Sequence, residues 1–223
     1  MRGWSRRETP THKQKIIAMR LIPSKVSMHW RLDGPAHAAA LGSTAIVGVY
    51  WILQRKQSKA TLSALTPQIF GLMRINTFSS LALVLAPVPL TGRLAVLDLP
   101  LFNKTPLTDL SSIVLSAAGV AVSIWARNTL ADNWDASPVI KRDHVLVQNG
   151  PYSLMRHPMY TGVLLIFLGA GLATARTRSL LFLSVLPFFV YTALAEEGLM
   201  RTTFSDEYSA YAARVKRFIP FVV

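Results

Sequence analysis

Five long apolar runs constrain the fold of this 223-residue chain more than any other feature. They lie at about residues 36–53, 69–90, 110–126, 158–175 and 179–195, and each approaches the roughly 17–25 residues that a membrane-spanning helix needs. Hydrophobic residues make up 51% of the chain and charged residues only 16%, which is too apolar for an average soluble domain. We therefore predict an all-α, polytopic integral membrane protein with about five transmembrane helices.

These runs divide the chain into three regions. Residues 1–34 form a basic tail, residues 35–126 hold three transmembrane helices, and residues 127–223 hold two more and a C-terminal amphipathic helix. The third run contains Gly119 among other small residues, which suit close contact between helices. Only a short break separates the fourth and fifth runs, so the fifth helix is expected to return antiparallel beside the fourth.

The C-terminal amphipathic helix carries signals for its own start and end. Ser205 is the predicted N-cap, and Pro220 is expected to stop the helix. Acidic residues fall in its first turn and basic residues in its last, as the helix dipole prefers. The basic residues expected in that last turn are Arg214, Lys216 and Arg217.

Charge and composition narrow the possible partners. The net charge of +13 indicates contact with phospholipid headgroups, because the chain shows no basic-aromatic module of the kind that binds nucleic acid. Cysteine is absent, which excludes disulfides, thiolate metal sites and a cysteine nucleophile. We expect membrane lipids as partners, and neither nucleic acid nor a metal.

The segment from His144 to Gly162 lies between two apolar runs but is dense in groups that a membrane rejects. Gly150 and Pro151 predict a turn, with Asn149 before it. A polar segment of this length between apolar helices is too long to be only a turn, and long loops are often functional.

Pro158 predicts where the next helix begins. A proline suits the first turn of a helix, where its missing N–H costs nothing, and it pushes the preceding His157 out of helical geometry. The helix then runs directly into an apolar stretch. Arg156, His157 and Tyr160 are therefore expected where a membrane helix meets water.

The pattern H-x-L-V-x-x-G-P-Y-x-x-x-R-H-P-x-Y-x-G of this segment, with Glu196-Glu197 and several tyrosines behind it, resembles the isoprenylcysteine carboxyl methyltransferase family and its bacterial relatives. The resemblance covers roughly Arg127 to the C-terminus. It implies methyl transfer from the cofactor S-adenosylmethionine to the carboxylate of a lipophilic small molecule or a prenylated substrate. Such a carboxylate is ionised near neutral pH, so the protein must supply alignment and a dry site rather than a general base.

The resemblance also assigns roles to individual residues. The cofactor-binding residues it implies are His144, Val145, Leu146, Val147, Tyr152, His157, Pro158, Met159, Tyr160 and Glu196. The catalytic candidates are Arg156, Glu197 and Arg201. Glu197 and Arg201 also stand four residues apart, the spacing of an ordinary helix ion pair.

One position departs from the family pattern. The family places a basic residue about one turn before the glutamate pair, where this chain has Thr192. No arginine or lysine occurs between Arg178 and Arg201. Arg201 is therefore our first candidate for the cation that meets the acceptor carboxylate, and Arg156 is the second.

Two other classes of protein remain open at this point. A phospholipid or amine N-methyltransferase shares the general membrane layout, and its neutral nucleophile would not need the missing cation. A non-enzymatic membrane scaffold is the other alternative. A measurement of S-adenosylmethionine binding would distinguish the two kinds of methyltransferase, which bind it, from the scaffold, which does not.

The orientation in the membrane follows from where the cofactor is made. The active site is expected to face the cytoplasm, in a cap built from residues 127–156 and 196–223, in either a bacterial inner membrane or the endoplasmic reticulum. With five helices, the basic tail would then lie on the wrong side for the positive-inside rule. Either the tail folds back as a sixth element, or the chain starts at Met19 or Met28.

Overall fold

The structure, a computed structural model, describes residues 34–54, 61–64, 67–86, 90–134, 139–141 and 144–222. All of these fall within residues 32–223, which form one unit. The basic tail, with the alternative starts Met19 and Met28, lies outside the described residues.

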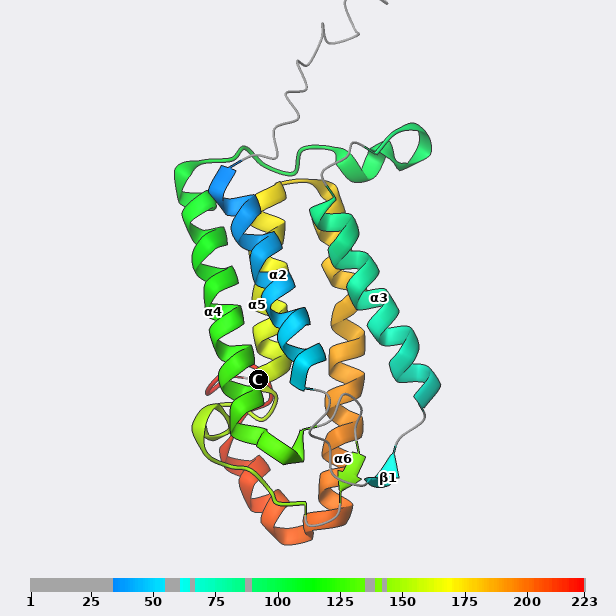
Figure 1. The fold of residues 1–223 in the computed structure, drawn as a ribbon, viewed down its shortest axis with the longest axis vertical. Helices are drawn as coiled ribbons and strands as arrows, with labels where there is room; N and C mark the ends of the chain where they lie inside the picture. Colours follow the sequence, from blue (N-terminus) through cyan, green and yellow to red (C-terminus); the bar gives the residue numbers. More distant parts are fainter. Residues whose placement is uncertain are drawn as a thin grey trace, which may run out of the picture. The chain divides into compact units, whose positions relative to one another are not determined.

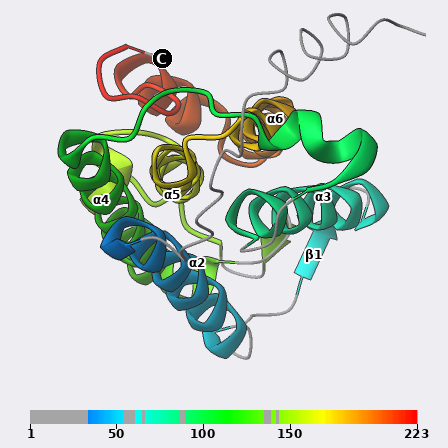
Figure 2. The ribbon, with the colours of Figure 1, turned by 90° about the horizontal axis from the view of Figure 1, so that it is seen from above.

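In the described part of the chain, five long helices lie side by side, and each runs antiparallel to the one before it (Figures 1 and 2). They are α2 (Gly34–Gln54), α3 (Pro67–Leu85), α4 (Pro106–Leu130), α5 (Pro158–Thr174) and α6 (Phe182–Arg214). Each corresponds to one predicted apolar run, and α6 returns antiparallel to α5 as expected.

Three helical stretches of the described residues are long and apolar enough to cross a membrane: Gly34–Leu53, Pro106–Asn133 and Thr177–Arg214. The apolar parts of the other two helices, Ile75–Leu85 and Pro158–Thr174, are shorter. Helices satisfy their own backbone hydrogen bonds, which is what a lipid environment requires. The protein is therefore a helical integral membrane protein.

Short elements connect the helices. The 3-10 helices are η2 (Gly92–Asp98), η3 (Ala131–Asn133), η4 (Gly150–Ser153) and η5 (Thr177–Leu181). Two short strands, β1 (Thr61–Ala64) and β2 (Val139–Lys141), pair antiparallel with Ser63 opposite Ile140. These strands lie at the end of the bundle where α4 ends and α5 begins, which we call the site end (Figure 1).

Helix α4 is longer at both ends than the apolar run predicted. Thr105 and Thr108 form a capping box, and Pro106 occupies the first turn, so the helix begins at Pro106 instead of at residue 110. The C-terminal end carries Arg127, the residue at which we expected the cap to begin. Its residue exposure is only 3%, because the helix continues for another turn and buries it.

The predicted start of the last helix was right, but its predicted end was wrong. The helical backbone is broken at Ser205, which has φ 40° and ψ −109°, so α6 consists of two helical segments joined at a kink and the second begins after Ser205. The helix then ends at Arg214, so Lys216 and Arg217 lie beyond its last turn. Val215 adopts extended geometry because Lys216, the residue after it, pairs with Met155 in the loop before α5.

Small residues let α4 and α5 pack closely. A Cβ atom added to Gly119 would lie 2.5 Å from the carbonyl oxygen of Gly162, and one added to Gly169 would lie 2.3 Å from the Ser116 hydroxyl. The Ser112 hydroxyl donates to the carbonyl of Gly169 at 2.8 Å. The predicted role of Gly119 in close helix contact is confirmed, and the contact fixes the helix that carries the start of the site.

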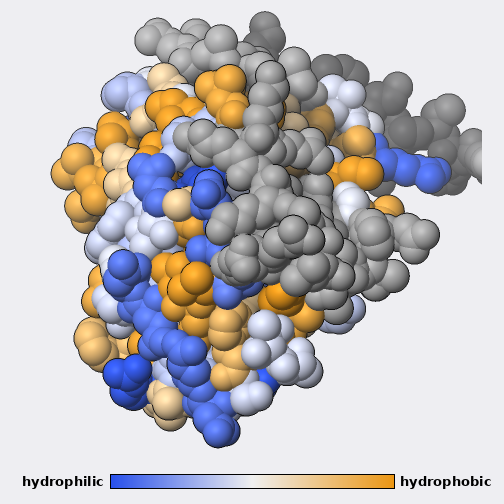
Figure 3. All heavy atoms as spheres, turned by 60° about the horizontal axis from the view of Figure 1, so that its bottom comes forward, coloured by the Kyte–Doolittle hydropathy of each residue, from blue (hydrophilic) through white to orange (hydrophobic). Residues whose placement is uncertain are grey.

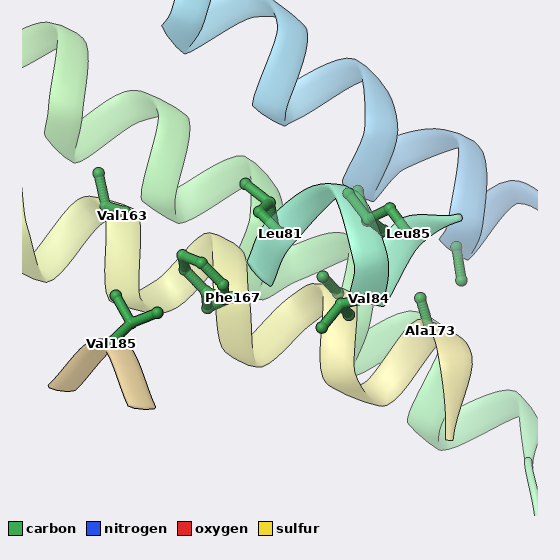
Figure 4. Close-up of a cluster of buried hydrophobic side chains, with 10 residues drawn as sticks. Leu81, Val84, Leu85, Val163, Phe167, Ala173 and Val185 are labelled. Carbon is green, nitrogen blue, oxygen red and sulfur yellow. The ribbon is translucent and has the colours of Figure 1, made fainter. Parts of the chain in front are cut away.

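An apolar core fills the half of the bundle away from the site end, with side chains from α2, α3, α5 and α6 turned toward one another (Figure 4). We call this set the inner core: Ala36, Ala40, Leu81, Val84, Leu85, Val163, Phe167, Ala170, Ala173 and Val185. The helices are packed in this half, while the half nearer the site end encloses a cavity.

Candidate active site

The cavity has a volume of about 500 Å³, which lies in the range of small-molecule and cofactor sites. Toward the site end it has a polar pole, formed by His144, Arg156, His157, Tyr160, Glu196 and Glu197. Toward the inner core it has an apolar limb, lined by Thr44, Gly48, Trp51, Phe78, Ile166 and Phe188 among others. A lipophilic molecule with a polar head would match this division.

The loop before α5 folds as the sequence predicts. Gly150 has φ 55°, a conformation that favours glycine, and the N–H of Tyr152 donates to the carbonyl of Asn149 at 3.1 Å. Pro158 occupies the first turn of α5, and His157 before it is non-helical with φ −123° and ψ 57°. The predicted turn at Gly150 and the predicted helix start at Pro158 are both confirmed.

A C-terminal segment, residues 215–218, runs along this loop, and we call it the C-terminal strap. The N–H of Arg156 donates to the carbonyl of Lys216 at 2.8 Å, and the N–H of His157 donates to the carbonyl of Arg217 at 3.0 Å. The Thr161 hydroxyl donates to the carbonyl of Phe218 at 2.8 Å. The end of the chain therefore holds the backbone that presents the polar pole.

Glu197 is the buried centre of an ion-pair network. Its side chain is 3% exposed and accepts hydrogen bonds from Arg156 at 2.9 and 3.0 Å and from Arg217 at 2.7 and 3.0 Å. Arg156 also donates to the carbonyls of Ala212, at 3.0 Å, and Val215. Two guanidinium groups thus compensate the charge of one carboxylate that would otherwise be costly to bury.

His157 lies between the two adjacent glutamates. Its Nδ1 is 3.3 Å from Oε2 of Glu196, and its Nε2 is 3.3 Å from Oε1 of Glu197. Burial lowers the pKa of His157, but hydrogen bonds to Glu196 and Glu197 outweigh that effect and raise the pKa above its usual value. Only an imidazolium can donate from both ring nitrogens, so the geometry favours the charged form.

Glu196 stands at the wall of the cavity. Its side chain is 27% exposed, and its two oxygens contact His157 and the hydroxyl of Tyr160. The Tyr160 ring stacks on His157 with centroids 5.5 Å apart and packs against Phe189. These contacts hold a carboxylate at the cavity, where it would attract a cationic ligand.

Aromatic side chains line another part of the cavity wall. The rings of Trp51 and Trp134 lie 6.5 Å apart, and the guanidinium of Arg127 lies 4.5 Å from the centre of the Trp134 ring. Tyr152 is fixed at its carbonyl by the Tyr211 hydroxyl at 2.7 Å. Burial raises the pKa of Tyr152 well above its usual value, so it remains a neutral phenol.

Most of the residues predicted from the motif line this cavity. Those that do are His144, Val145, Leu146, Val147, Tyr152, Arg156, His157, Met159, Tyr160, Glu196 and Glu197. Pro158 is buried behind the wall at the start of α5. Arg201 does not line the cavity: its side chain is 52% exposed, 3.9 Å from Glu197 and over the ring of Tyr208.

The sequence did not indicate several contributors. Arg217 was expected in a helix turn, yet it binds Glu197, and Trp51 was not among the expected site residues, yet it lines the cavity. Trp134 lines it too. A basic residue near the C-terminus and two tryptophans beside polar segments are weak signals by themselves, because only the folded chain brings them to one place.

Comparison with known proteins supports the motif. Residues 108–207 match the family model described as phospholipid methyltransferase. The protein named protein-S-isoprenylcysteine O-methyltransferase of Saccharomyces cerevisiae is 33% identical over 132 residues, 56% of this chain and 55% of that protein. The protein of the same name in Schizosaccharomyces pombe is 32% identical over 83 residues, 36% of this chain and 35% of that protein.

A relative named for a different substrate also matches. Methanethiol S-methyltransferase 1 of Bradyrhizobium diazoefficiens is 37% identical over 71 residues, 31% of this chain and 24% of that protein. The chain thus spans about half or less of the length of these curated relatives. Together the matches confirm the resemblance to the isoprenylcysteine carboxyl methyltransferases, and the matched stretch 108–207 contains both the motif and the glutamate pair.

Proposed function

We propose that this chain, which resembles the isoprenylcysteine carboxyl methyltransferases, transfers a methyl group from S-adenosylmethionine to the carboxylate of an isoprenylcysteine-like acceptor. One observation carries the proposal: a carboxylate, Glu196, is held by His157 and Tyr160 at the polar pole of a cavity that is otherwise apolar. A cationic donor and a lipophilic acceptor can meet there with little water between them.

The residues at the polar pole fit the donor. S-adenosylmethionine, when bound, supplies a methyl group on a positively charged sulfur. Glu196 provides the complementary negative charge, and the faces of Tyr152 and Trp134 are the aromatic surfaces that attract cations. The segment from His144 to Val147, which also lines the cavity, is the part of the wall on which we place the rest of the cofactor.

Arg156 is the best-placed cation for an acceptor carboxylate. Among the described residues that line the cavity it is the only arginine or lysine, which puts it ahead of Arg201. Glu197 holds its guanidinium in a fixed position, so we assign Glu197 the role of positioning Arg156. S-adenosylmethionine would supply the methyl group when bound, and because the acceptor carboxylate is already ionised, no residue of this chain would have to accept a proton.

The arrangement of the helices supports a lateral route for the acceptor. Ile52 of α2 and Phe78 of α3 line the cavity and are 70% and 54% exposed, so the cavity wall is open between these helices. We propose that all five helices cross the membrane, since α3 and α5 lie beside the three longer spans. The acceptor would then enter from the bilayer and keep its tail in an apolar environment.

The site end is the end that we propose to face the cytoplasm, where the donor is made. The described residues within 127–156 and 196–222 lie at this end (Figure 1), which supports a cap over the cavity. Figure 3 brings this end forward, and hydrophilic residues gather on it between hydrophobic patches. A polar cap of this kind suits contact with water and with headgroups.

A second candidate is N-methylation of a phospholipid amine. The family model that matches residues 108–207 is described as phospholipid methyltransferase, and Thr192 lines the cavity where the family pattern has a basic residue. A neutral amine needs no cation beside it. The acceptor assay below separates it from a carboxylate.

Binding of S-adenosylmethionine to the purified protein in detergent tests the donor site. Substituting Glu196→Gln removes the charge while nearly keeping the shape, so the affinity should fall at least tenfold, about 1.4 kcal/mol. Glu207→Gln is the matched control, because Glu207 is an exposed glutamate of the same helix that contacts Gln148. Equal affinities of the two variants would remove Glu196 from the site, and no binding to the unmodified protein would favour a scaffold.

The acceptor is tested with labelled S-adenosylmethionine and a panel of lipophilic compounds. The panel contains a farnesylcysteine analogue, a fatty acid, a phosphatidylethanolamine and a quinone-like phenol. We expect methylation of the farnesylcysteine analogue. Turnover of the phosphatidylethanolamine alone would establish N-methylation of a phospholipid amine in place of carboxylate methylation.

A further inference from the structure

The apolar limb of the cavity ends inside the bundle. Its innermost lining residues are Thr44 on α2, Ile166 on α5 and Phe188 on α6. Immediately beyond them the inner core is packed: Phe167 is 2% exposed and Val185 is 0% exposed. A tail that lies along the limb therefore reaches a wall of packed side chains and not a continuous channel (Figure 4).

The length of the limb can be worked out from helix geometry. On α2 the lining runs from Ile52 inward to Thr44, and on α6 from Glu196 inward to Phe188. At roughly 1.5 Å per residue, each of these stretches advances about 12 Å along its helix axis. Two helices on different sides of the cavity thus give the same depth.

We propose that the limb limits the length of the acceptor tail that the protein can enclose. The enclosed length is on the order of ten bonds, since an extended chain advances roughly 3.5 Å for every three bonds. The inference rests on the proposed function and adds a substrate class to it. The best acceptors are carboxylates whose apolar tail fills the limb. Any further length has to turn out toward the bilayer, past Ile52 and Phe78, where it gains no additional enclosure.

Gly48 offers a way to shorten the limb. It lies one turn of α2 from Thr44, it lines the cavity, and an added Cβ atom would meet nothing within 4 Å. A Cβ atom at this position therefore displaces no neighbour, and we expect a larger side chain to extend into the limb. Gly42 on the same helix also has open space for a Cβ atom but does not line the cavity, so it supplies the matched control.

The test is a series of N-acetyl-S-alkylcysteines assayed for methylation in nanodiscs. Within the limb each added methylene should raise kcat/KM by about fourfold, as expected for burial of one methylene. Beyond about ten carbons the increase should stop. Gly48→Leu should move this break to tails roughly half as long, and Gly42→Leu should leave it unchanged.

Gly48→Val serves as a milder variant, and unchanged affinity for S-adenosylmethionine shows that each variant is folded. An increase that continues to tails of about eighteen carbons, or a break that Gly48→Leu does not move, would overturn the inference.

If no compound of the series is methylated, the proposed function fails but the limb can still be tested. Analogues brominated at the tail end should quench the fluorescence of Trp51 and Trp134, which line the cavity. The binding affinity obtained from this quenching should rise with tail length and stop rising at about ten carbons. Binding that shows no such break in the unmodified protein would overturn the inference independently of catalysis.

Discussion

Replacing Arg217 by methionine tests whether the C-terminal strap holds the site together. Arg217 binds both oxygens of Glu197, at 2.7 and 3.0 Å, and its backbone carbonyl accepts from the N–H of His157. Methionine keeps the apolar stem of the side chain but loses both charged hydrogen bonds. The buried carboxylate of Glu197 would then be less well compensated.

The magnitude follows from what each oxygen of Glu197 retains. Oε1 keeps Arg156 and His157, so its loss is small, whereas among the described residues Oε2 keeps only Arg201, at 3.9 Å. The cost is therefore close to one charge-assisted hydrogen bond, about 1.5–3 kcal/mol. Because the Arg217 side chain is 30% exposed, water replaces part of the interaction, and we expect the lower half of that range.

Thermal unfolding in detergent is the assay. For a chain of this size the loss corresponds to a decrease in Tm on the order of 5 °C. Lys216→Met is the matched control, since Lys216 is the adjacent residue and its side chain is exposed. In the Glu197→Gln background the effect of Arg217→Met should nearly vanish. Equal shifts for the two single variants, or full additivity with Glu197→Gln, would refute the reasoning.

Two further predictions concern charge and topology. The folded pKa of His157 is raised, so the stability that its charged form contributes is complete below its unfolded pKa of about 6.5 and is lost as the pH rises through the folded pKa. The Tm difference between the unmodified protein and His157→Gln should shrink as the pH rises above about 6.5 and through the raised folded pKa; a constant difference would argue against the imidazolium. In a membrane-oriented preparation, Ser153→Cys and Ser209→Cys should be labelled from the same side, and the chain has no cysteine of its own. Labelling from opposite sides would contradict the cap.

Local signals in the sequence were sufficient for most of the secondary structure. Gly150 and Pro158 act on their own backbone and on the residue beside them, so the turn and the start of α5 could be predicted from the chain. Apolar runs identified the helices because the lipid interior requires apolar side chains along the whole span. The ends of α4 and the C-terminal end of α6 were less predictable, since the Thr105 capping box is a short, weak pattern and α6 stops where the residues after it run alongside Met155.

The motif likewise determined which residues gather at the polar pole, because His144, His157 and Glu196 belong to one pattern that already implies a site. It did not determine how they are held. The sequence contains Glu197 and Arg217 twenty residues apart, and nothing in that spacing predicts a bidentate pair.

Only the tertiary structure decided that pair, the place of Trp51 in the cavity wall, and the depth of the apolar limb. Each of these depends on where separate helices lie relative to one another. The close approach of α4 to α5 fixes the start of the site, the kink in α6 turns the chain back, and the inner core closes the limb. Contacts between distant segments arise from packing the whole chain, so a local pattern cannot encode them by itself.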